Sequence, residues 1–144
     1  MRILASRTTT FVSRLSAVLL AVAAASAVGT TTANASSGGG CATGAHLESC
    51  ISASGSHLEP DIYVLHDSGC SYVSVEVLNA SNGAIAWQDD QVNGGCALGI
   101  HGPWALDTAN SSVANGGTYY TVATMTLTNG TSDMTISHNE TLSY

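Results

Sequence analysis

Three consecutive residues, His66, Asp67 and Ser68, carry the side-chain types of a hydrolase triad. In a working triad the nucleophile, the base and the orienting carboxylate converge from separate parts of the fold. Consecutive side chains of a strand or turn diverge instead, so we interpret residues 66–68 as a turn. The chain also has no G-x-S-x-G elbow, no H-E-x-x-H pair and no phosphate-binding glycine loop followed by Lys. The sequence therefore predicts a protein that is not an enzyme and uses no cofactor.

Acidic side chains offer a second kind of candidate chemistry. Glu59 with Asp61, and Asp89 with Asp90, are pairs that a glycosidase could use, but neighbouring acids are more typical of solvated surface charge. Asp89 and Asp90 also lie near Asn93 and offer hard oxygen ligands, yet no D-x-D-x-D-G calcium loop is present. We leave open whether a divalent ion binds these acidic loops.

Histidines are the remaining candidate metal ligands. Their spacing matches no structural or catalytic zinc pattern, and we interpret them as scattered, partly exposed side chains. They are His46, His57, His66, His101 and His138. The sequence therefore predicts no defined metal site.

Fixed positive charge is confined to the first fourteen residues, at Arg2, Arg7 and Arg14. All ten acids lie from Glu48 onward, so loss of the N-terminal segment changes the formal net charge from -7 to -10, which is -7 minus the three lost cations. Phosphate backbones and anionic membranes are bound by clustered Lys and Arg. The composition therefore argues against a nucleic-acid surface and against a polybasic membrane anchor.

Residues 1–35 have the layout of a secretory signal peptide. The arginines precede an apolar run over residues 15–28, which is shorter than the roughly 20 residues of a membrane span. Small residues at Ala33 and Ala35 favour cleavage before residue 36. We expect a secreted, bacterial protein with a signal peptide at 1–35, a flexible Gly/Ser-rich leader at 36–45 and a single domain at 46–144, and no membrane attachment after cleavage.

A hairpin is predicted in the middle of this domain. Residues 72–79 alternate valine with polar side chains, as a half-buried strand does, and an Asn-Gly turn leads into the next strand. A three-residue loop would place Val77 opposite Trp87 and Asn79 opposite Ile85, whereas a two-residue turn would shift the pairing by one residue. Burial of apolar side chains favours the first register.

Four cysteines in an exported chain favour two disulfides over a metal site or a redox centre. In either register of the hairpin, Cys70 lies opposite Gly94 or Gly95. Both glycines are within two positions of Cys96, and their flexibility allows the two cysteines to meet. We therefore predict the bond Cys70–Cys96, which leaves Cys41 to pair with Cys50.

Short strands separated by turn residues recur through the domain, and we find no helical period, heptad or repeat in it. The most regular strand pattern covers residues 118–128. It places Tyr120 and Val122 on one face and, on the other, Tyr119, Ala123, Met125 and Leu127. Seven or eight such strands predict an all-β fold, a small antiparallel β-sandwich of immunoglobulin-like type with two disulfides. A small closed β-barrel is the alternative.

These observations favour a secreted, non-catalytic binding or assembly module that docks to another extracellular protein. It would be an adaptor subunit of an exported multi-protein complex or an inhibitor of an extracellular enzyme. Edge strands allow β-augmentation, and an acidic surface complements a basic partner. The candidate binding residues are Pro103 and Trp104, in a loop over residues 99–106, and the tyrosines Tyr72 and Tyr120.

Two other functions are consistent with the sequence. In a carbohydrate-binding module, Trp104, Trp87 or Tyr72 would provide a stacking platform with Asn and Asp nearby. The chain also resembles the neocarzinostatin-type apoproteins in its general make-up, which is a small acidic secreted domain with two disulfides, few bases and a predicted seven-stranded sandwich. The resemblance covers architecture and composition only, and it implies a carrier of a small apolar ligand.

Overall fold

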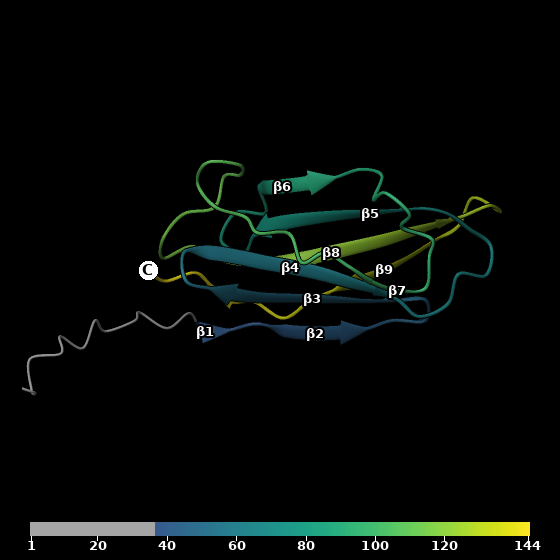
Figure 1. Ribbon diagram of the computed structural model, residues 1–144, viewed down its shortest axis with the longest axis horizontal. Helices are drawn as coiled ribbons and strands as arrows, with labels where there is room; N and C mark the ends of the chain where they lie inside the picture. Colours follow the sequence, from purple (N-terminus) through teal and green to yellow (C-terminus); the bar gives the residue numbers. More distant parts are fainter. Residues whose placement is uncertain (1–36) are drawn as a thin grey trace, which may run out of the picture. The chain divides into compact units, whose positions relative to one another are not determined.

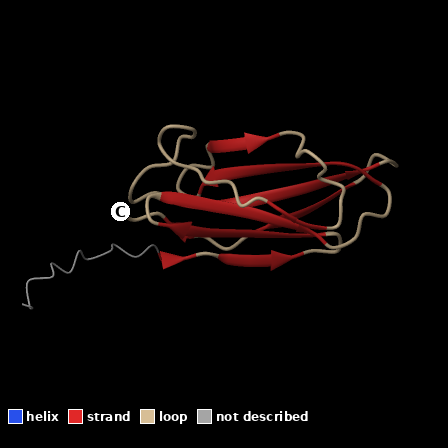
Figure 2. Cartoon of the chain, in the orientation of Figure 1, coloured by secondary structure: helices blue, strands red, loops and turns tan. Residues whose placement is uncertain are grey.

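The computed structural model describes residues 37–144, and the predicted signal peptide at 1–35 lies outside them. The described part consists of strands and loops, and none of its segments is a helix able to cross a membrane (Figures 1 and 2). The strands are β1 (Ser37–Gly38), β2 (Gly40–Thr43), β3 (Leu47–Ser54), β4 (His57–Val64), β5 (Cys70–Asn79), β6 (Ile85–Asp89), β7 (Gly99–His101), β8 (Thr118–Leu127), β9 (Ser132–Ile136) and β10 (Glu140–Thr141).

These strands form two antiparallel sheets. Sheet A has the order β1-β10-β8-β5-β6, and β9 also pairs with β8; sheet B has the order β2-β3-β4-β7. Strands β5 and β6 lie in one layer and strands β3 and β4 in the other (Figure 1). The prediction of a small antiparallel sandwich is confirmed at this level. The alternative of a closed barrel is wrong, because no strand pairing within residues 37–144 joins one sheet to the other.

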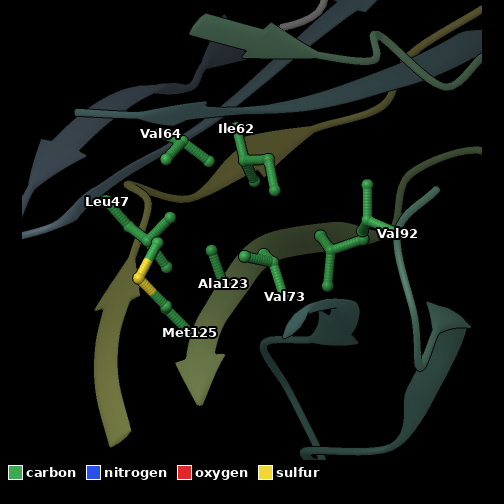
Figure 3. Packing of buried hydrophobic residues seen from close by; sticks show 8 residues of the cluster. Leu47, Ile62, Val64, Val73, Val92, Ala123 and Met125 are labelled. Carbon is green, nitrogen blue, oxygen red and sulfur yellow. The ribbon is translucent and has the colours of Figure 1, made fainter. Parts of the chain in front are cut away.

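Period-two alternation places the core between the sheets. Leu47, Ile62 and Val64 of sheet B pack against Met125 and Ala123 of sheet A, and Figure 3 shows these side chains directed into the space between the layers. A second buried cluster continues the core and contains Ile51, Leu58, Val77, Ala86, Leu106, Val113, Tyr119 and Leu142. The alternating pattern of the sequence thus identified the inward faces of the long strands.

The β5–β6 hairpin has the predicted pairing at its centre but not at its turn. Val77 lies opposite Trp87, as expected, and Gly83 has a positive φ of 70°. A register shift after Val77 then places Leu78, rather than Asn79, opposite Ile85. The physical reason is that Asn79 belongs to the turn: its side-chain oxygen accepts a hydrogen bond from the backbone N–H of Ser81 at 2.9 Å.

Both predicted disulfides are present. Cys41 is bonded to Cys50 and Cys70 to Cys96. The first bond joins β2 to β3, whose bridged Cα atoms lie 4.1 Å apart. Residues 37–43, which we expected in a flexible leader, therefore belong to the sheets. Backbone pairing and a disulfide hold this segment, and neither depends on the apolar side chains that sequence patterns detect.

Candidate functional site: the outer face of sheet A

The side of sheet A that points away from sheet B carries a continuous group of apolar side chains. We call this group the apolar face; it consists of Ile85, Leu78, Tyr120, Val122, Ile136 and Met134. Four neighbouring strands contribute to it, in the spatial order β6, β5, β8 and β9. Since inward positions on these strands already form the core, these outward side chains contribute a second apolar surface.

Strand register brings the members of the apolar face together. Ile85 lies opposite Leu78, which lies opposite Tyr120, so one row crosses three strands. Val122 lies opposite Ile136 in the next row. Residues directly opposite in antiparallel strands have Cβ atoms about 5 Å apart, so these pairs touch.

Three members of this group remain strongly exposed despite those contacts. Ile85 is 49% exposed, Ile136 is 48% exposed and Met134 is 58% exposed, while Val122 is only 9% exposed because its neighbours cover it. Apolar side chains scattered singly over a surface need no explanation, but a contiguous group on regular strands is typical of an interaction site.

Glu76 is the one carboxylate within the rows of the apolar face. It lies opposite Val122 on one side and opposite Gln88 on the other. Ser74 and Thr124 are the polar members of the next row, in which Met134 lies opposite Thr124. The face therefore has an apolar centre, one acid and a hydroxyl-bearing border.

The outer face of sheet B has the opposite character. Glu48, Glu59 and Asp61 lie on its outward positions, and Tyr63 stands beside them. Burial raises the pKa of Asp61 above its ordinary value of 3.8, against a hydrogen bond from Tyr63 that lowers it, while the charges of Glu48 and Glu59 raise it further. This acidic face would repel an anionic partner and another copy of itself.

The predicted binding residues are not gathered in one place. Trp104 packs against both core clusters together with Trp87, and neither indole is a freely projecting platform. Pro103 is exposed on the edge of sheet B beside Trp104. Tyr72 and Tyr120 share the outer side of sheet A, but they are paired with Thr126 and Leu78 respectively, at opposite ends of β5.

The histidines and residues 66–68 lie in loops and at strand ends, whereas Glu59 and Asp61 lie within β4. Residues 65–69 form the exposed connection between β4 and β5, so His66, Asp67 and Ser68 lie in a turn-containing loop, as expected. The rings of His46 and His66 meet edge to face at 6.2 Å between centroids. Within residues 37–144 one group of three possible metal ligands is close together, Cys41, Glu48 and Cys50, and its two sulfurs are joined in a disulfide.

Sequence reasoning missed most of the apolar face. Of its members, only Tyr120 was among the candidate binding residues. A signal was present, because Val122 lies two residues after Tyr120 and therefore on the same outward side, and Met134 and Ile136 repeat that spacing. Only the strand order shows that β9 and β8 are neighbours, which joins the two pairs into one surface.

Comparisons with known protein families, with curated proteins and with solved structures returned no match for this chain.

Proposed function

We propose that this chain is a secreted, non-catalytic module that docks another extracellular protein on the apolar face of sheet A. The observation that carries the proposal is the exposure of Ile85, Met134 and Ile136 within a continuous group of apolar side chains. Because these residues stand on paired strands, the surface is rigid, and little conformational entropy is lost when a partner binds.

The size of the apolar face fits the centre of an interface rather than a whole one. From β6 to β9 it spans three strand spacings, about 14 Å, and along the strands it spans a similar length, from the row of Tyr120 to the row of Met134. A standard interface covers roughly 800 Å² on each partner and places a polar border around its apolar centre. Ser74, Thr124 and Gln88 supply such a border here.

The partner that best fits this face is a protein with a basic surface around an apolar centre. All ten acids and none of the three fixed cations of the sequence lie within residues 37–144. Glu76, inside the apolar face, would pair with a cation of the partner. A second copy of this chain would instead bring two polyanions together, with Glu76 facing acids across a symmetric contact.

Ile136 and Ile100 provide a matched test. Both are isoleucines on short strands with similar exposure, 48% and 52%, but Ile136 lies on the apolar face and Ile100 on β7 of sheet B. A photo-crosslinking amino acid at position 136 should form an adduct with a basic extracellular protein in culture supernatant of the source organism, and the same group at position 100 should not. The purified partner should bind at least about tenfold more weakly to Ile136→Asp and unchanged to Ile100→Asp.

Three outcomes would each count against the proposal. Equal adducts from positions 136 and 100, adducts only between copies of this chain, or unchanged affinity of Ile136→Asp would each overturn it. Binding should also weaken as salt increases, because the partner is expected to be basic.

We also propose that the immunoglobulin-like description applies to sheet A. Its hairpins β5–β6 and β8–β9 lie side by side through β5 and β8, which is the arrangement of strands C, C′, F and G in variable-type domains. In sheet B the consecutive strands β3 and β4 are neighbours, as strands A and B are in an immunoglobulin sheet, and β4 lies beside β7, as strand B lies beside strand E. An experimental structure with the same β6-β5-β8-β9 pairing would support the description.

A further inference from the structure

A hollow of about 550 Å³, open to solvent, lies between the start of β5 and the loop that follows β6. We call it the loop pocket. Its polar and aromatic groups come from Ser71, Tyr72, Gln91 and Asn93, and residues 94–97 complete the wall with backbone and small side chains. Its volume is within the range of about 300 to 1,000 Å³ that is typical of sites for small molecules.

The loop of the pocket is fixed to the sandwich. The disulfide Cys70–Cys96 ties it to the start of β5, and the N–H of Val92 donates to the carbonyl of Val73 at 2.9 Å. Gly95 is packed so closely that an added Cβ would lie 2.9 Å from the oxygen of Val92 and 3.1 Å from Cβ of Val73. A preformed wall loses little conformational entropy when a ligand binds.

The chemistry of the wall selects a neutral ligand rich in hydroxyl groups. No Asp, Glu, His, Lys or Arg lines the loop pocket, so a charged ligand would find no counter-charge there. Gln91 and Asn93 each offer an amide donor and an amide acceptor. An apolar ligand would leave these amides without partners, at a cost of roughly 1 to 3 kcal/mol for each group so buried.

We infer that the loop pocket binds a neutral oligosaccharide. Tyr72, which is 39% exposed, stacks its ring on the C–H face of a pyranose, and its phenol group remains free to hydrogen-bond. Gln91 and Asn93 hydrogen-bond to the equatorial hydroxyls around the rim of the sugar. The amide and hydroxyl groups of the wall thus match the polar edge of the ligand while the aromatic ring matches its apolar face.

This site is separate from the apolar face. Tyr72 precedes Ser74 by two residues on β5, and Met134, the member of the apolar face in the row of Ser74, lies two strands further on, about 10 Å across the sheet. The saccharide inference therefore does not rest on the proposed docking of a protein, and either can fail without the other.

Cellohexaose, xylohexaose and chitohexaose are suitable probes, titrated at millimolar concentration against the isotope-labelled protein and followed by amide NMR shifts. At least one should shift the amides of Gln91 and Asn93. Tyr72→Ala should then raise the Kd for that saccharide about tenfold. Tyr72→Phe should change this Kd by less than about twofold because the ring is retained. Asn93→Ala should raise the Kd about fivefold through a lost hydrogen bond.

Tyr144→Ala is the matched control, because Tyr144 is a tyrosine of similar exposure, 44%, outside the loop pocket. Its Kd should equal that of the parent protein. The inference is overturned if none of the three saccharides shifts the amides of the pocket, or if Tyr72→Ala and Tyr144→Ala have the same affinity. Circular dichroism of each variant shows whether the sandwich is retained, and Asn93→Ala tests the site even if Tyr72→Ala unfolds.

Discussion

The indole rings of Trp87 and Trp104 lie 5.4 Å apart between centroids, with their planes tilted by 42°. Trp87 stands on β6, at one edge of sheet A, and Trp104 follows β7 at the facing edge of sheet B. Both rings pack against both core clusters. The pair therefore holds the sheets together on a side where no strand pairing joins them.

Replacement of Trp104 should destabilise the domain strongly. Trp104→Ala removes the ring contact with Trp87 and opens space beside both core clusters, so we expect a loss of about 3 kcal/mol in the free energy of unfolding. Urea denaturation at constant pH measures the change. Leu98→Ala is the control, since Leu98 is 61% exposed and its loss should change stability by less than about 0.5 kcal/mol. Equal effects of the two changes would contradict this account.

The two disulfides should contribute unequally to stability. The loop closed by Cys70–Cys96 has a sequence separation of 26, and that closed by Cys41–Cys50 a separation of 9. The chain-entropy relation gives about 3.5 kcal/mol for the longer loop and about 2.6 kcal/mol for the shorter one. Unfolding of the two double Cys→Ala variants should therefore show a larger loss without the 70–96 bond. The reverse order would show that native-state contacts of β2 outweigh loop entropy.

Stability should increase on mild acidification because of Glu140. This side chain is 3% exposed, and burial raises its pKa above the ordinary value of 4.5. The pKa of Glu140 is higher in the folded protein than in the unfolded chain, so the folded state binds the proton more tightly. The free energy of unfolding therefore falls as pH rises from the unfolded pKa through the folded one. The pKa of Asp61 is also raised, from an ordinary value of 3.8, so this residue likewise lowers the free energy of unfolding as pH rises above that value.

Glu140→Gln separates this effect from the general charge of the chain. The variant should be more stable than the parent at pH 7, and its stability should depend less on pH above 4.5. Denaturant titrations at several pH values between 4 and 8 provide the measurement. A variant that is less stable at pH 7 would show that the carboxylate of Glu140 has a stabilising partner.

Added salt should stabilise the domain at neutral pH. Within residues 37–144 the acids have no Lys or Arg as partners, and the ion pair found there, His57 with Asp107 at 3.5 Å, depends on protonation of the histidine. Salt therefore screens mainly repulsion, so the melting temperature at pH 7.5 should rise between low and moderate sodium chloride. A melting temperature that falls over this range would contradict the prediction.

The inward faces of the long strands, one disulfide and one turn follow from local patterns in the amino-acid sequence. Alternation of apolar and polar residues fixed the inward faces of β5 and β8, because a strand turns every second side chain to the same side. The positions of Cys70 and Cys96 around a hairpin predicted their bond, and Gly83 identified the turn.

Tertiary structure decided which of these strands are neighbours. β9 lies beside β8, and this pairing turns Val122, Ile136 and Met134 into one surface. Likewise, Trp104 is part of the inter-sheet packing because segments far apart in sequence meet at the open side of the sandwich. A strand pattern specifies two faces but not the strands beside it, since backbone hydrogen bonding is the same for every sequence.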